Sequence, residues 1–600
     1  MAKKGYITEG FYQGGYSTLE PGYGSVFTGY RARAGSLGTS TDIRTANLLK
    51  EVSDKLASGQ QVVEASLINP EMVEAIPKQH LKEVARLSKL TGAEVTVHGP
   101  VIETSGLSQE AGFSETNRQV SEKRMIQTVE KSKEINPMGN VPVTFHSTEG
   151  IPASTYGKGE KGEKVARRII AINQETGRMV PLEEEERYYP GMEKEGEDKI
   201  EHRIHDPLEQ LEIVNNTEWS NAIAQVEFNR ENAERILGDV PNEWVMALAP
   251  LEKQEQLQNL TPEQTKMWQK IYSAKEYLKQ AKLSADALFS KAYRFGTEKE
   301  KRKIEGMSKQ YKKDLLFKGD QPTLGTINPQ VQSQAMLNLV KELEQVKPDL
   351  YVPVEKFAIE KSSDTFSNVA LAAYNKFKDK SPIVSIENPP ASGFALSSGD
   401  DIRNLVEKSR EKFVKKAVEK GIMSESKAKA QAEKLIGATW DVGHINQMRR
   451  FGFDEADVVK ETEKIAPYVK HVHLSDNFGQ ENVELPMGMG NVPLKEMMKK
   501  LGKKGDEAKK IVEAMHWWQH FGSSPMATSL EAMGSPIYSM DMQPYWNQAI
   551  GLQQGYFGGY GQMLPTINYE TFGAGFSTLP TELGGQKQGA GGRMSGTPME

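Results

Sequence analysis

Short apolar segments alternate with amphipathic helical stretches along much of the chain, and this alternation is the strongest constraint on its fold. Helical patterns at 78–90, 116–133 and 454–466 lie between or beside these segments. Such an order is typical of a parallel sheet whose strands are joined by crossover helices. The expected strands are 62–67, 94–99, 141–147, 383–388, 438–444, 469–475 and 526–532. With an eighth strand from about 535–541 or from the N-terminal segment, the prediction is an α/β fold, a TIM (β/α)8-type barrel.

The alternation is interrupted after the third expected strand. The segment 167–185 predicts a hairpin that turns at Glu175–Thr176–Gly177, and long charged helical patterns follow at 206–238 and 261–315. Loops at strand ends tolerate large insertions, and 600 residues exceed one compact core. We therefore expect a hairpin-plus-helix insertion between two barrel parts. The predicted divisions are a tail at 1–40, barrel at 41–150, insertion at 151–325, barrel at 326–540 and a tail at 541–600.

The two predicted tails are rich in Gly, and the N-terminal one also in Tyr, with little apolar surface to bury. Such composition is typical of flexible segments, with binding to an unknown partner as the alternative. The chain has no stretch of eighteen apolar residues, and its start, MAKKGYITEG, lacks an apolar signal segment. We expect a cytoplasmic protein without membrane contact.

Cysteine is absent, which excludes disulfides, thiolate metal sites and cysteine nucleophiles. Any metal must therefore bind to imidazole and carboxylate groups. The net charge of −6 argues against a surface coated all over with nucleic acid but leaves a local basic groove open.

Six of the expected strands repeat one arrangement, in which the apolar residues share one face and a polar residue near the strand end lies on the other. In the segment 94–99, for example, Val95 and Val97 oppose Thr96 and His98. In a barrel such end residues converge at the carboxyl face, where active sites of this architecture lie. Carboxylates packed so closely would repel one another, so a cation is the economical explanation. The predicted cluster is His98, His146, Glu387, Asp441, His473 and Glu531.

Other residues near these strand ends are candidate metal ligands, and some of them have a simpler structural explanation. His444 follows Asp441 by three positions and joins the predicted metal ligands. Glu484 is a further candidate ligand or a solvated loop acid, and Asp476 a ligand or a turn cap. His202 and His205 lie in a charged stretch that favours a solvated face.

Several short motifs together resemble the xylose isomerase-like TIM-barrel superfamily and, within it, AP endonuclease family 2, which includes endonuclease IV. The resemblance covers about 40–150 and 325–535. Its motifs are HGP (His98), FHS (His146), IEN (Glu387), DVGH (Asp441 and His444), HLSD (His473 and Asp476), GMGN (488–491) and LEAMG (Glu531).

The endonuclease pattern implies one metal on His98, His146 and Glu387, and a second on Asp441, His473 and Glu531 with Glu387 bridging. His444 would belong to a third metal. The chain departs from that pattern, since Asn482 and Glu484 stand where the family has an Asp and a His. Sugar isomerases and epimerases of the superfamily usually need only the Glu387, Asp441, His473 and Glu531 set, for one metal.

The resemblance implies a hydrolase that cleaves abasic DNA or a related phosphate ester with Glu387, Asp441 and Glu531 as catalytic carboxylates. Zinc is the first expected metal and manganese the alternative. The rival hypothesis is a metal-dependent isomerase or epimerase of a sugar or small phosphorylated sugar, and a non-enzymatic scaffold is the third. Arg449, Arg450 and Trp517–Trp518 are candidate DNA contacts, with surface and core roles as the alternatives.

Overall fold

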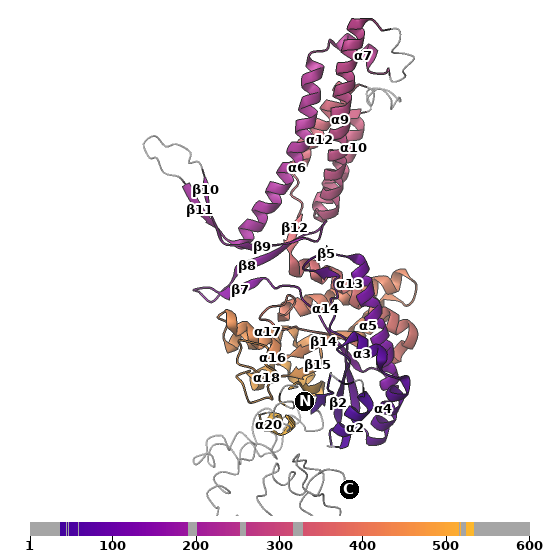
Figure 1. The fold of residues 1–600 in the computed structure, drawn as a ribbon, viewed down its shortest axis with the longest axis vertical. Coiled ribbons are helices and arrows are strands. Elements are labelled where there is room, and N and C mark those ends of the chain that lie inside the picture. The colour runs from indigo at the N-terminus through magenta and orange to yellow at the C-terminus, as the bar shows by residue number, and fades with distance from the viewer. Residues whose placement is uncertain are drawn as a thin grey trace, which may run out of the picture. The chain divides into compact units, whose positions relative to one another are not determined.

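The chain contains a closed barrel of eight parallel strands (Figure 1). The computed structural model describes residues 37–43, 45, 47–57, 59–189, 201–251, 260–315, 328–514, 517 and 524–532. Around the barrel the strands follow the order β1-β16-β15-β14-β13-β6-β3-β2. The predicted TIM (β/α)8-type fold is confirmed. The strands are β1 (Leu37–Ser40), β2 (Val62–Ser66), β3 (Glu94–His98), β6 (Pro142–His146), β13 (Ile383–Glu387), β14 (Ile436–Asp441), β15 (Val469–Leu474) and β16 (Lys509–Val512).

Helices surround the barrel and cover the apolar outer faces of its strands (Figure 1). On β14, Trp440 is fully buried and its ring nitrogen donates to Thr462 Oγ1 of α17 at 3.1 Å. Local signals define several helix ends: Ser398 and Asp401 form a capping box at the start of α14, and Gly92 ends α4 with φ 73°. The barrel helices are α2 (Leu48–Ala57), α3 (Pro70–Ala75), α4 (Lys78–Thr91), α5 (Glu115–Ile135), α13 (Val354–Phe377), α14 (Gly399–Glu419), α15 (Glu425–Leu435), α16 (Val442–Asn446), α17 (Glu455–Ile465), α18 (Leu494–Glu507) and α20 (Met526–Ala532).

The inward-facing residues include two neighbouring sets of polar side chains. The first set includes small hydroxyl side chains that bond to one another: Thr439 donates to Ser385 Oγ at 2.7 Å and lies 2.9 Å from Thr144 Oγ1. The second set lies at the carboxyl ends of the strands, where Glu387 pairs with His146 and Asp441 with His473 in the strand register. The period-two prediction of inward polar faces is confirmed on these strands.

Two expectations about the strands need correction. The segment 526–532 is the helix α20, not a strand, and β16 at Lys509–Val512 closes the barrel instead. Short apolar runs fit either period, which explains the wrong assignment. β16 is hidden in the sequence by its two lysines, although Lys510 is 1% exposed and Lys509 pairs with Glu94 at 2.9 Å.

The remaining strand comes from the N-terminal segment, as one of the two alternatives proposed. It is β1, whose residues the sequence had suggested as the end of a tail. The alternative at 535–541 and the predicted tail at 541–600 lie outside the described residues.

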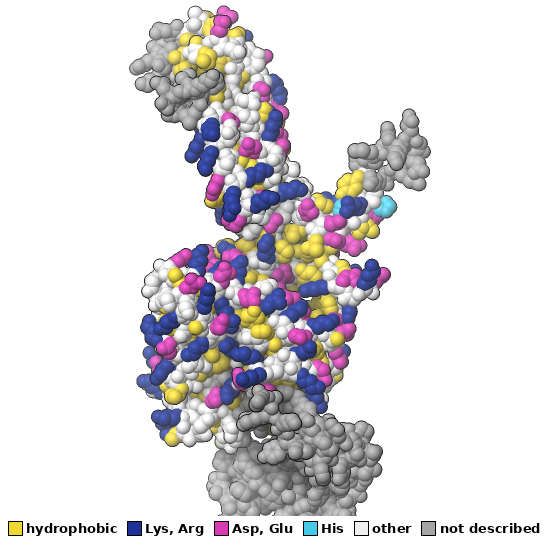
Figure 2. All heavy atoms as spheres, turned by 180° about the vertical axis from the view of Figure 1, so that it is seen from behind, with side chains coloured by type: hydrophobic (Ala, Val, Ile, Leu, Met, Phe, Trp, Pro, Cys, Tyr) yellow, Lys and Arg dark blue, Asp and Glu magenta, His cyan; other side chains and the backbone are white. Residues whose placement is uncertain are grey.

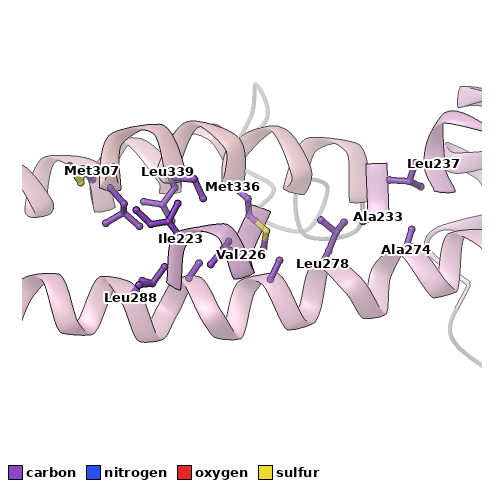
Figure 3. Close-up of a cluster of buried hydrophobic side chains, with 14 of the residues drawn as sticks. Ile223, Val226, Ala233, Leu237, Ala274, Leu278, Leu288, Met307, Met336 and Leu339 are labelled. Carbon is purple, nitrogen blue, oxygen red and sulfur yellow. The ribbon is translucent and has the colours of Figure 1, made fainter. Parts of the chain in front are cut away.

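A second compact unit spans Ala166–Val354. Its long helices α6 (Pro207–Gly238), α9 (Pro262–Phe295), α10 (Glu298–Leu315) and α12 (Pro329–Leu343) run along one another (Figure 1). They enclose a hydrophobic core of their own, which includes Ile223, Leu278 and Leu339 (Figure 3). Because α12 packs in this core, the unit extends beyond the predicted end at 325. It begins at Ala166, later than the predicted 151.

Short strands complete both units. The predicted hairpin corresponds to β8 (Lys164–Asn173) and β9 (Met179–Glu183), and β12 (Tyr351–Pro353) pairs with β8 on its other side.

No helix in the described part of the chain is long and apolar enough to cross a membrane. The other elements are β4 (Leu107–Ser108), β5 (Gly112–Phe113), β7 (Thr155–Lys158), β10 (Glu185–Tyr189), β11 (Glu201–His205), α7 (Asn242–Leu248), η3 (Lys378–Lys380), η4 (Gln447–Phe451) and η5 (Ala466–Tyr468).

Candidate metal centre

Six potential metal ligands gather at the carboxyl end of the barrel, five on different strands and one directly after a strand. Five of them are the predicted His98, His146, Glu387, Asp441 and His473. The sixth is Glu513, directly after β16, whereas the predicted Glu531 lies on α20 and its side chain is outside the described residues. The cluster is buried, with His146 the most exposed of its side chains at 17%.

Glu387 lies at the centre of this cluster and contacts three imidazoles. Its Oε2 atom lies 3.1 Å from His98 Nε2 and 3.3 Å from His146 Nε2, and its Oε1 atom lies 2.6 Å from His473 Nδ1. Burial by itself raises the pKa of Glu387, but the charge of His473 and the hydrogen bonds from His146 and His473 outweigh burial and hold that pKa well below its ordinary value. Glu387 is therefore an ionised carboxylate that links two groups of ligands.

The larger ligand group is a quartet formed by Glu387, Asp441, His473 and Glu513. One ligand atom of each residue lies within 4.8 Å of all the others. Burial raises the pKa of Glu513 well above its ordinary value, and the negative charges of Glu387, Asp441 and Glu484 raise it further. Such crowding of buried acids is what a divalent cation relieves, and oxygen and imidazole donors suit zinc or manganese. The quartet fits a metal ion on the chemistry of its donors.

A second group, the triad of His98, His146 and Glu387, shares its carboxylate with the quartet. His98 Nδ1 lies 2.8 Å from the carbonyl oxygen of Gly99, to which it can donate only if the proton is on Nδ1. Its Nε2 lone pair then faces Glu387 and the centre. Burial lowers the pKa of His146, which keeps this imidazole neutral and able to bind a metal.

His444 lies beside the triad, with ring centroids of His444 and His146 6.0 Å apart. Its Nδ1 atom is 2.8 Å from the carbonyl oxygen of Asn388, so its Nε2 lone pair remains available. It belongs to none of the ligand groups found among the described residues. Its role as a ligand stays a prediction.

Asp441 is held in place by the turn that follows β14. Its Oδ1 atom accepts N–H bonds from Gly443 at 2.7 Å and His444 at 2.8 Å, which caps the short helix α16. Gly443 is required here, because a Cβ atom would meet Ser475 Oγ at 2.2 Å and its carbonyl oxygen at 2.6 Å. The DVGH motif thus fixes Oδ1 of Asp441 and leaves Oδ2 as the oxygen that could bind a metal ion.

Asp476 has the turn-capping role that the sequence offered as its alternative. Its carboxylate accepts backbone N–H bonds from Asn477, Gly488, Gly490 and Val492, at 2.8–3.0 Å. These bonds hold the glycine-rich loop after β15, and Asp476 belongs to no ligand group among the described residues.

The other loop candidates do not complete a third ligand set in the described residues. Glu484 lies close enough to raise the pKa of Glu513 but is in none of the ligand groups. Asn482 Oδ1 accepts a bond from Gln447 Nε2 at 2.7 Å. Arg449, a candidate DNA contact, donates to the carbonyl oxygen of Asn491 and lies 3.5 Å from Glu455.

The predicted solvated pair on β11 is divided in the structure. His202 is exposed, but His205 is buried and contacts Tyr189 and Glu209 at 2.8 and 3.0 Å.

Sequence reasoning missed Glu513 and Glu64. Glu513 is followed by Ala514 and Met515, and Glu531 by Ala532 and Met533, so the same tripeptide occurs twice. The first copy directly follows an Ile-Val pair, which was the available signal. Glu64 lies between Val63 and Ala65 on β2, and the period of two places it on the inner face.

No protein-family model matches the chain, and no curated protein matches it. Among solved structures, a D-tagatose 3-epimerase-like protein is 12% identical, with 84% of this chain and 98% of that chain covered at a TM-score of 0.36. The 3-keto-D-glucoside 4-epimerase YcjR from E. coli, in its apo form, is 9% identical with the same coverages at a TM-score of 0.33. At these values the fold assignment rests on the barrel's own strand order, and the likenesses carry no argument about activity.

Proposed function

We propose that this chain is a metal-dependent isomerase or epimerase that acts on a small sugar or sugar phosphate. The observation that carries the proposal is the quartet of Glu387, Asp441, His473 and Glu513, the one group of four ligands found among the described residues. It has the Glu–Asp–His–Glu composition that the resemblance associates with one-metal sugar isomerases and epimerases, with Glu513 in place of Glu531. A bound divalent cation would polarise a substrate carbonyl and orient a neighbouring oxygen.

Two carboxylates of the quartet are placed to move a proton. Glu387 Oε1 and Glu513 Oε1 approach the same ring nitrogen, His473 Nδ1, at 2.6 and 3.2 Å. One carboxylate would take a proton from the substrate and the other would return it, which is general acid–base catalysis.

The surface of the barrel unit also supports a small substrate. On the face shown in Figure 2, Lys and Arg side chains are interspersed with Asp and Glu. Ion pairs in the barrel unit include Lys412 with Glu360 at 2.8 Å. A duplex substrate is gripped mainly by uncompensated cations on phosphates. The residues that stand in the endonuclease's third-metal positions, Asn482 and Glu484, also argue for the isomerase.

The second candidate is the phosphodiester hydrolase that the sequence analysis placed first, acting on abasic DNA or a related ester. The triad of His98, His146 and Glu387 favours it, because a second cation could bind there with Glu387 as the bridge. Paired cations stabilise both the attacking and the leaving oxygen of a phosphate ester.

Metal counting combined with two assays distinguishes the two functions. The full-length protein, loaded with Mn²⁺ or Zn²⁺, would be analysed for bound metal by mass spectrometry and compared with His98→Ala and His146→Ala. We expect one tightly bound ion in all three proteins. We also expect deuterium from D₂O to enter the carbon next to the carbonyl in at least one of a panel of ketoses and their phosphates.

Glu387→Gln should abolish this exchange, because the substitution removes both the negative charge that binds the metal and the group that accepts the proton. Two ions in the wild type, one ion in either His variant and cleavage of abasic DNA would establish the hydrolase instead. Exchange that persists in Glu387→Gln would contradict the isomerase mechanism.

A further inference from the structure

A second cluster of polar side chains lies inside the barrel, directly below the candidate metal ligands. It consists of Glu64 on β2, Thr96 on β3 and His471 on β15, all fully or almost fully buried. In the strand register Glu64 is beside Thr96, one layer below His98. Burial of a carboxylate at this depth is costly unless several donors satisfy it. The partners of Glu64 therefore indicate what it does.

Glu64 reaches upward to His473, a member of the quartet. His473 Nε2 lies 3.1 Å from Glu64 Oε1 and 3.4 Å from Oε2. The other ring nitrogen, His473 Nδ1, faces Glu387 and Glu513. The two nitrogens of this one imidazole thus contact two different sets of carboxylates.

The carboxylate of Glu64 is itself fixed by other donors. His471 Nε2 lies 3.0 Å from Oε2, and Thr96 Oγ1 donates to the same oxygen at 3.2 Å. These contacts come from β3 and β15, on different sides of β2 in the barrel order. Glu64 therefore has a defined orientation toward His473.

An imidazole that binds a metal through Nδ1 must carry its proton on Nε2, and an acceptor for that proton sets both the tautomer and the angle of the ring. We propose that Glu64 is the positioning residue of His473: it accepts the Nε2–H bond and so directs the Nδ1 lone pair into the quartet. The inference rests on the proposed metal centre and assigns no ligand role to Glu64.

The test is the affinity of the metal-depleted full-length protein for Mn²⁺, followed by electron paramagnetic resonance. Glu64→Gln keeps the shape of the side chain but removes its charge. We expect the dissociation constant for Mn²⁺ to rise about 10- to 100-fold, which is the usual effect of removing the hydrogen-bond partner of a metal-binding His. The number of bound ions should not change. Glu103→Gln is the control, because Glu103 is a half-buried acid that accepts bonds from Ser105 and Thr148, and it should change the affinity less than about twofold.

A second pair of variants shows whether Glu64 acts through His473. In a His473→Gln background, Glu64→Gln should weaken Mn²⁺ binding no further than about twofold, since the ring that Glu64 positions is gone. Unchanged affinity in Glu64→Gln, a lost ion, or additive losses in the double variant would each overturn the inference. If Glu64→Gln does not give a cooperative melting transition, Glu64→Asp is measured in the same way and must also weaken binding.

These outcomes separate the inference from the proposed function. Failure of the wild type to bind Mn²⁺ would remove the metal centre and both ideas with it. If the wild type binds Mn²⁺ and Glu64→Gln binds it with the same affinity, only the positioning role of Glu64 is wrong.

Discussion

At the scale of single residues, the candidate centre depends on which of two similar glutamates completes the quartet. Glu513 follows β16 and its Oε1 atom lies 3.2 Å from His473 Nδ1. Glu531 lies on the helix α20, outside the eight barrel strands. Both are followed by Ala-Met in the sequence, so they form a natural pair for a comparison.

We expect Glu513→Gln to weaken metal binding at least about tenfold, since it removes a charged ligand from a four-ligand site. Glu531→Gln should leave the dissociation constant within about twofold of the wild type. Competition with a chelating indicator measures both constants. Loss of metal affinity in Glu531→Gln but not in Glu513→Gln would show that Glu531, as predicted from the sequence, is the fourth ligand.

Glu355, at the start of α13, should make the stability of the barrel depend on pH. Burial, with repulsion from Asp401, raises the pKa of Glu355 to about 7, although Ser154 donates two bonds to it. The folded protein then holds a proton that the unfolded chain loses near pH 4.5. Stability is therefore expected to fall by up to about 3 kcal/mol between pH 4.5 and 7.

Glu355→Gln should remove this fall and be more stable than the wild type at pH 8 but not at pH 4.5. Urea unfolding at the two pH values measures the difference. Glu360→Gln, on the same helix, is the opposite control: burial raises the pKa of Glu360, but Lys408 and Lys412 outweigh burial and lower it. That variant should be destabilised at neutral pH, and equal pH profiles for both variants would contradict the argument.

At the scale of elements, the loop between β15 and α18 depends on one side chain. Asp476 accepts the N–H groups of Asn477, Gly488, Gly490 and Val492, so a single carboxylate fixes both ends of the loop beside the candidate metal centre. Gly490 lies so close that a Cβ atom would be 2.4 Å from Asp476 Oδ1. The loop is shaped around this acid.

Asp476→Ala should therefore lower the free energy of unfolding by about 2 kcal/mol or more, because several N–H groups lose a charged acceptor. Hydrogen exchange of the amides at 488–492 should become faster. The number of bound metal ions should stay the same, which separates this role from that of a ligand. A variant that loses a metal ion while the loop amides remain protected would show that Asp476 is a ligand after all.

At the scale of the whole molecule, the chain divides into two units with separate hydrophobic cores. In the second unit, Leu278 of α9 is 1% exposed among the buried residues of α6 and α12 (Figure 3). Chains with more than one core often unfold in more than one step. A cavity in one core should then leave the other unit's properties unchanged.

We expect Leu278→Ala to destabilise the second unit by about 2–5 kcal/mol, the usual cost of a buried Leu-to-Ala cavity. Leu283→Ala is the control on the same helix, since Leu283 is 58% exposed, and should cost less than about 0.5 kcal/mol. Thermal unfolding of the full-length protein should show one transition lowered and metal affinity unaltered. A parallel loss of metal affinity would mean that the two units do not fold independently.

The sequence by itself predicted the barrel and the clustering of five of the six candidate ligand residues. The reason is local: in a strand the side chains alternate, so His98, His146, Glu387, Asp441 and His473 could be placed on inner faces without knowing which strands are neighbours. The absence of cysteine and the crowding of acids and imidazoles then pointed to a metal.

Only the tertiary structure decided how the barrel closes, because closure depends on contacts between distant segments. β1 and β16 lie at opposite ends of the barrel sequence, and they pair with Gly38 beside Ile511. Neither of these short strands has a strong apolar pattern. That pairing places Glu513 at the centre. The approach of Glu64 to His473 spans 409 positions and follows from the curvature of a closed sheet, which a period of two along one strand does not contain.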